Sequence, residues 1–167
     1  TAREPADSKT TDPNLTRGEQ EFINDILRGT SICLAQLNGL QSLTNYFAQH
    51  GERPYEYRLY EALAQLYLEQ QRIEDAANVY RTFVARHPNY PQAPLIDSKI
   101  LAVYEKGGFS DLVQTAKEDF INHYEPSAVY WTKNPGADRG DTLKKVREYF
   151  QEVTRYAHAK AQKTKAA

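Results

Sequence analysis

The feature of this sequence that most limits its possible folds is a helix ending that occurs three times. The segments Phe47–His50, Val84–His87 and Phe120–His123 each end an apolar stretch, and each is soon followed by a proline. Their histidines stand 37 and 36 residues apart. A period of this length is typical of a helix–turn–helix unit, which cannot bury its apolar face alone and stacks on its neighbours. The chain is therefore expected to consist of helical repeats.

Apolar residues recur at helical spacing along most of the chain, and no segment alternates convincingly as a half-buried strand would. This pattern predicts helices at 40–50, 56–70, 73–87, 93–106, 109–124 and 141–163. Thr16 and Glu19 have the spacing of a capping box, which predicts an earlier helix start. Gly29 and the β-branched residues after it argue against one unbroken helix there. Residues 1–15 hold two prolines and no apolar periodicity, so we expect a flexible lead-in.

The segment 125–140 differs from the rest because it contains two prolines and two glycines, and it is expected to form a long loop. It carries two adjacent aromatic residues, Tyr130 and Trp131. Aromatic side chains exposed on loops often anchor interfaces, so one interpretation is a contact with a partner. The other interpretation is that both side chains fold back and pack on the preceding helices.

The middle unit carries the pattern that identifies a family. It reads Tyr60-x-x-Leu63-Ala64-x-x-Tyr67, then Ala76-x-x-x-Tyr80, then Pro88. Over residues 57–90 this spacing resembles the tetratricopeptide repeat (TPR) without a gap. The resemblance implies that Ala76 lies where two antiparallel helices approach closely, and that Tyr80 packs across the seam between them. The flanking units are degenerate.

The expected architecture is an all-α, TPR-like, right-handed solenoid of helical hairpins, and a fragment of a longer array. We divide the chain into a lead-in (1–15), a degenerate N-terminal hairpin (16–54), a well-matched TPR (55–90), a degenerate TPR (91–124), a loop (125–140) and the first helix of an incomplete further repeat (141–167).

The stretch from Gly39 to Tyr124 also resembles long TPR proteins of the Gram-negative bacterial envelope. The segments that carry this likeness are His50–Glu56, Leu66–Glu69 and Val103–Phe109, with Tyr156–Lys160 similar to the next repeat of those proteins. The resemblance implies a role in assembly or scaffolding, in the periplasm or at the outer membrane.

Composition and spacing disfavour several classes of function. The formal net charge of -1 argues against a nucleic-acid partner, and no apolar run is long enough for membrane insertion. The three repeated histidines should lie about one repeat apart, too far to share a zinc ion with bonds of about 2 Å. Cys33 is flanked by Ile32 and Leu34 and is expected to be a small buried hydrophobe. We therefore expect no enzyme, no metal and no cofactor.

The resemblance also implies a partner-binding groove on the first helix of the middle unit. The family's groove positions map onto Arg58, Glu61, Ala62, Gln65, Leu68 and Glu69. TPR domains that bind a C-terminal carboxylate would need Lys and Asn where this chain has Glu61 and Gln65. An acidic residue there would repel a carboxylate. The expected ligand is a neutral or basic protein segment or peptide.

The last predicted helix carries an apolar stripe with no following helix to cover it. Its members are Leu143, Val146, Tyr149, Phe150, Val153, Tyr156 and Ala157. Either this helix packs on residues 109–124 with one side still exposed, or helix 142–163 pairs with a neighbouring molecule. For a repeat helix that lacks its partner we expect a divided stripe, with Phe150 and Val153 buried and the adjacent aromatic residues open.

From these observations we expect a non-catalytic protein–protein interaction or scaffold module of a larger bacterial envelope protein. The alternative is a purely structural spacer between domains of a larger assembly. A third and weaker alternative is a non-catalytic part of an enzyme.

Overall fold

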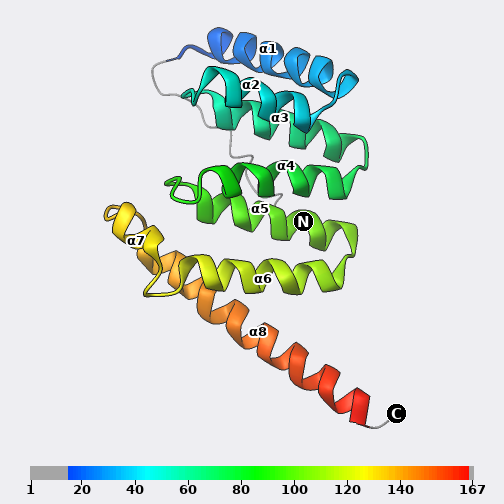
Figure 1. Cartoon of the computed structure of the whole chain (residues 1–167), viewed down its shortest axis with the longest axis vertical. Helices are drawn as coiled ribbons and strands as arrows, with labels where there is room; N and C mark the ends of the chain where they lie inside the picture. The colour runs from blue at the N-terminus through cyan, green and yellow to red at the C-terminus, as the bar shows by residue number, and fades with distance from the viewer. Residues whose placement is uncertain (1–14, 166–167) are drawn as a thin grey trace. The chain divides into compact units, whose positions relative to one another are not determined.

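The computed structural model describes residues 15–165, with side chains described as far as residue 162. Over that range the chain forms eight α-helices and no strand (Figure 1). They are α1 (Arg17–Gln36), α2 (Leu40–His50), α3 (Glu56–Glu69), α4 (Ile73–Arg86), α5 (Ala93–Gly107), α6 (Ser110–Tyr124), α7 (Val129–Lys133) and α8 (Arg139–Lys165). The all-α prediction is confirmed. The predicted flexible lead-in lies outside the described residues, except for its last residue.

The chain divides into two compact units, one ending at Leu63 and the other beginning at Ala64. The first unit contains α1, α2 and the first part of α3. The second contains the rest of α3 and every later helix.

In the first unit, α1 begins at the predicted capping box. The Glu19 amide donates to Thr16 Oγ1 at 3.3 Å, and the Thr16 amide donates to Glu19 Oε2 at 2.8 Å. The helix then continues unbroken for 20 residues, so Gly29 and the β-branched residues after it do not interrupt it. A single glycine costs only about 1 kcal/mol in a helix.

The apolar residues of α1 are poorly covered. Phe22 is 66% exposed and Ile26 50%, and Leu37 at the C-cap is 70% exposed, whereas the buried residues of this helix are Gln20 and Ser31. Cys33 is also exposed, so the prediction that it is a buried hydrophobe is wrong. Its apolar neighbours in sequence did not indicate burial, because adjacent residues of a helix point in different directions.

In the second unit, α4, α5 and α6 pack one after another, and α8 packs on α6 (Figure 1). Ala76 on α4 is completely buried, and Tyr80 is 1% exposed. The Tyr80 hydroxyl accepts a hydrogen bond from Gln65 Nε2 at 3.3 Å. The turn between α5 and α6 uses two glycines. Gly108 has a φ of 73°, and a Cβ on Gly107 would lie within 2.8 Å of side-chain atoms of Phe109 and Ile73.

The segment 125–140 is not the long loop that the sequence predicted, because its middle forms the short helix α7. Tyr130 and Trp131 are 4% and 7% exposed and belong to a buried cluster with Ala93, Phe120, Tyr124 and Val146. Trp131 Nε1 donates to the Glu125 carbonyl at 2.9 Å, and the Tyr130 hydroxyl donates to the Pro91 carbonyl at 2.7 Å. The interpretation in which both aromatic residues pack on the preceding helices therefore describes them. A five-residue helix is too short to show helical periodicity in its sequence.

The last helix, α8, packs on α6 along one side only. Tyr149, Glu152 and Tyr156 contact α6, at the three- and four-residue spacing of a single helix face. Lys145, on the same face, donates to Ser98 Oγ on α5. Phe150 lies one position beyond this face and is 61% exposed, so the expectation that it is buried is wrong. Val153 is half-buried. Pairing of this helix with a neighbouring molecule stays a prediction.

Candidate binding groove

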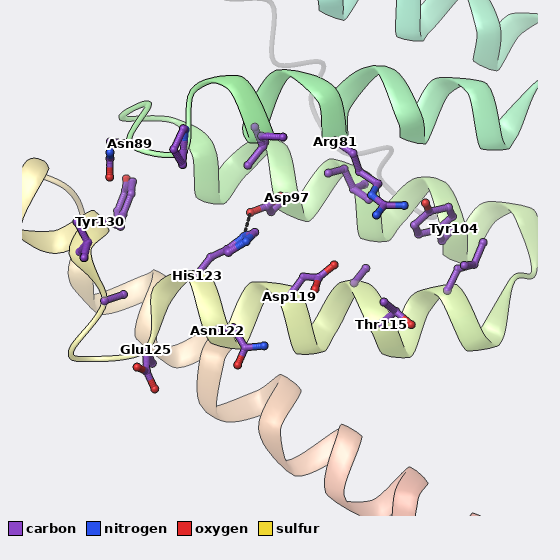
Figure 2. A pocket seen from close by; sticks show the side chains of 18 of the residues that line it. Arg81, Asn89, Asp97, Tyr104, Thr115, Asp119, Asn122, His123, Glu125 and Tyr130 are labelled. Carbon is purple, nitrogen blue, oxygen red and sulfur yellow. Dashed lines mark hydrogen bonds and ion pairs between the residues drawn. The ribbon is translucent and has the colours of Figure 1, made fainter.

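The second unit contains a groove of about 640 Å³ between α4 and α6, with α5 at its floor (Figure 2). The segment that leads from α6 into α7 closes one end. Its lining comes from α4 (Arg81, Val84, Ala85), α5 (Asp97, Ile100, Tyr104), α6 (Leu112, Thr115, Ala116, Asp119, Asn122, His123), α7 (Val129, Tyr130) and the connecting residues Pro88, Asn89, Glu125, Ser127 and Ala128. A concave surface that joins an apolar floor to a few polar groups is the usual form of a ligand site.

The most buried polar group of the groove is the Asp97 carboxylate, whose side chain is 9% exposed. Its Oδ2 accepts a hydrogen bond from the Tyr124 hydroxyl at 2.7 Å and contacts His123 Nδ1 at 3.1 Å (Figure 2). No hydrogen bond from any residue between 15 and 162 reaches the other oxygen, Oδ1. One half of this carboxylate is therefore held in place, and the other half is available in the groove.

This arrangement also changes how the two donors of Asp97 titrate. The hydrogen bond to Asp97 raises the pKa of His123, although its partial burial works in the opposite direction, and the nearby charge of Asp119 adds to the rise. Burial raises the pKa of Tyr124 above its ordinary value, with Asp97 as the next cause. The Tyr124 hydroxyl therefore stays protonated and remains a donor to Asp97.

Two further charged side chains face each other across the groove. Arg81 extends from α4 and Asp119 from α6 (Figure 2). Neither of them makes a hydrogen bond or ion pair with another residue that the structure describes. In total the lining has three carboxylates (Asp97, Asp119 and Glu125) against the one guanidinium of Arg81. The charged groups of the groove are therefore mainly acidic, most strongly when His123 is neutral.

The serine and threonine hydroxyls of the groove lining donate to groups other than the pair of Asp97 and His123. A His–Asp pair can activate a hydroxyl nucleophile that contacts the histidine. The two hydroxyl side chains of serine and threonine in the lining point elsewhere, since Thr115 donates to the Asp111 carbonyl and Ser127 to Glu125 Oε1. Between residues 15 and 162, moreover, no three His, Cys, Asp or Glu side chains are grouped so that they could hold a metal ion.

The six groove positions predicted from the sequence all lie on α3, and none of them lines this groove. Glu69 is exposed, as is Gln65, and the other four are half-buried. Their binding of a partner stays a prediction. Of the two aromatic candidates, Tyr130 lines the groove and Trp131 does not.

Sequence reasoning missed the groove because its central pair is separated by 26 positions. The sequence did single out His123, because it ends a repeat unit. No sequence feature near Asp97 indicated that this aspartate contacts His123.

None of the helices between residues 15 and 165 combines the length and the apolar character that crossing a membrane requires. Comparison of the chain with protein-family models, with curated proteins and with solved structures finds no match.

Proposed function

We propose that this chain is a non-catalytic protein-interaction module that holds a segment of a partner protein in the groove between α4 and α6. The observation that carries the proposal is the groove itself. It places the apolar side chains of Val84, Ile100 and Leu112 beside charged groups on both walls. These are Arg81 on α4 and Asp119 on α6, which form no ion pair with each other. Such surfaces bind extended or helical segments through apolar contact and use polar groups for register.

A TPR-like, right-handed solenoid of helical hairpins is part of this proposal. It is supported by the burial of the residues that carry the family spacing, namely Tyr60, Ala64, Ala76 and Tyr80. It is also supported by the succession α4, α5, α6 and α8, in which each helix packs on the one before. The likeness to envelope TPR proteins extends the proposal to a scaffold of the bacterial cell envelope, where the predicted surface on α3 would be a second contact site.

The proposal is tested by selecting binders for the intact chain from a library of random linear peptides. We expect enriched peptides whose binding is lost in Ala85→Trp, because Ala85 is an exposed residue of α4 in the groove lining and a tryptophan would fill the space. The matched control is Ala102→Trp. Ala102 is also an exposed alanine, but it lies on α5 outside the groove lining, so this variant should bind as the wild type does.

The spacer alternative makes the opposite prediction. A chain that only separates flanking domains would enrich no peptide above background, or only peptides that bind Ala85→Trp and wild type equally. Either result would overturn the groove as the interaction site.

A further inference from the structure

We infer that the partner segment presents a lysine or arginine side chain to the groove, and that Asp97 Oδ1 is its main acceptor. This inference rests on the proposed function and names the chemistry that the groove would select. It assigns Asp97 as the specificity-determining residue, with Asp119 as a supporting acceptor from the opposite helix.

The first support is the state of the Asp97 carboxylate. The side chain is nine-tenths buried, and its Oδ2 is occupied by Tyr124 and His123, while Oδ1 accepts no hydrogen bond from a described residue. A carboxylate removed from water is stabilised most by a cationic donor, since charge-assisted hydrogen bonds are about twice as strong as neutral ones. The two existing donors fix the orientation of the carboxylate, so little freedom remains to be lost when a ligand binds.

The second support is the distribution of charge around it. Asp119 lies on the wall formed by α6 and has no ion-pair partner among the described residues, and Glu125 lies toward the closed end. The guanidinium of Arg81 is on the wall formed by α4 (Figure 2). A cationic side chain is therefore drawn to the α5 and α6 side, and Arg81 remains for a carbonyl or carboxylate of the same segment.

The third support is the apolar surface beside the carboxylates. Ile100 and Tyr104 continue along α5 from Asp97, and Ala116 faces them from α6. Lysine and arginine bury their methylene stems along such surfaces while the charged head reaches a polar partner. A simple metal cation would gain nothing from this surface, and the described residues provide no group of three metal-ligating side chains.

His123 gives this recognition a dependence on pH, because it shares the Asp97 carboxylate with the ligand. Asp97 on α5 and Asp119 on its own helix act on its imidazole, and the other charged groups of the groove lining are Glu125, just after that helix, and Arg81 on α4. Among the described residues, α8 adds no charged group to the lining. A protonated imidazole neutralises Asp97 and competes with a cationic side chain. Binding should therefore strengthen as the pH rises and His123 becomes neutral.

The experiment uses the same selection from random linear peptides on the intact chain. We expect enrichment of lysine or arginine at one position of the groove-dependent binders. A synthetic copy of an enriched peptide should bind Asp97→Asn at least about tenfold more weakly than wild type, and Asp119→Asn more weakly by a smaller factor. The matched control is Glu118→Gln, which removes a carboxylate from the adjacent exposed position of α6 outside the lining and should change affinity little.

A substitution in the peptide tests the same contact without altering the protein, so its result does not depend on whether Asp97→Asn folds correctly. Replacing the enriched lysine or arginine by glutamine should weaken binding to wild type about as much as Asp97→Asn does, and the two changes together should cost little more than one. Groove-dependent peptides without a basic residue would overturn this inference and leave the proposed function standing. An absence of groove-dependent peptides would overturn both.

Discussion

The first helix and the C-terminal aromatic cluster use similar apolar residues in opposite ways. In α1, Phe22 and Ile26 recur at helical spacing, yet each is at least half exposed. In the cluster around α7, Tyr130 and Trp131 show no periodicity and are almost completely buried. Helical spacing indicates which side of a helix could be covered. Burial itself depends on a partner segment, and here that partner is distant in the sequence.

The cluster is held together by hydrogen bonds as well as by apolar contact. Each of its polar aromatic atoms has a partner, with Tyr124 donating to Asp97, Tyr130 to the Pro91 carbonyl and Trp131 to the Glu125 carbonyl. An amphipathic aromatic side chain can be buried at low cost only when its polar atom is satisfied in this way. The exposed apolar residues of α1, such as Phe22 and Ile26, have no polar side-chain atoms that could form such hydrogen bonds.

The substitution Trp131→Ala tests the difference between the buried cluster and the exposed residues of α1, and we expect it to cause the largest loss of stability. Removing a buried tryptophan leaves a cavity and costs about 3–5 kcal/mol in the free energy of unfolding. Chemical denaturation followed by far-ultraviolet circular dichroism measures the loss. Trp131→Phe keeps a ring but loses the donor to Glu125, so it should lose less. An unchanged denaturation midpoint in Trp131→Ala would show that the cluster does not stabilise the second unit.

A smaller effect is expected from the ion pair that joins α6 to α8. Lys117 Nζ lies 2.6 Å from Glu152 Oε2, and the lysine side chain is 10% exposed. Glu152→Ala leaves a buried ammonium group without its acceptor, which should cost about 1–3 kcal/mol in thermal or chemical unfolding.

The control for this pair lies on α1, where Arg17 and Glu21 form an exposed ion pair. Glu21→Ala should leave the unfolding midpoint almost unchanged, because solvent and salt screen exposed pairs. Equal losses in the two variants would contradict the distinction between the covered and the uncovered region.

The pair of Asp97 and His123 predicts a modest dependence of stability on pH. Because the pKa of His123 is raised above 6.5 in the folded chain, its protonated form is favoured by folding. That contribution is complete below about pH 6.5, the ordinary value of the unfolded state. It is lost as the pH rises through the folded pKa. Thermal midpoints should therefore fall slightly over this window, and the fall should be reduced in His123→Gln. A slope that is equal in the variant would assign it to other groups.

The smallest effect is expected from Phe22→Ser. Because Phe22 is 66% exposed, its replacement should change the free energy of unfolding by no more than about 0.5 kcal/mol. The same denaturation measurement checks this. A loss comparable with that of Trp131→Ala would show that α1 is covered in solution by something that binds its apolar side.

Much of the fold could be predicted from local signals in the sequence. The capping box at Thr16 and Glu19 and the apolar period each act within a few residues, and each predicted an element at nearly its observed position. The expected exposure of individual residues was less reliable. Cys33 was expected to be buried because of its neighbours in sequence, and Phe150 because it belongs to the apolar stripe of the last helix. Both lie on uncovered sides of their helices.

The groove could not be predicted because it depends on which side chains three helices bring together. The predicted surface, which the resemblance to the TPR family implied, used positions on one helix, Arg58 to Glu69. The observed groove needs Asp97 beside His123 and Arg81 opposite Asp119. These juxtapositions follow from the packing of α4, α5 and α6, and their residue types carry no local pattern.

The burial of Trp131 gives the molecule a natural optical reporter. It is the single tryptophan of the chain, and it lies among Tyr124, Tyr130 and the guanidinium of Arg139. The wavelength and intensity of its fluorescence emission therefore report on one cluster in the second unit, while circular dichroism averages over every helix. If the two signals change at different denaturant concentrations, the units lose structure in separate steps. Because Tyr130 touches both this indole and the groove, a peptide that settles there can also be detected without any attached dye.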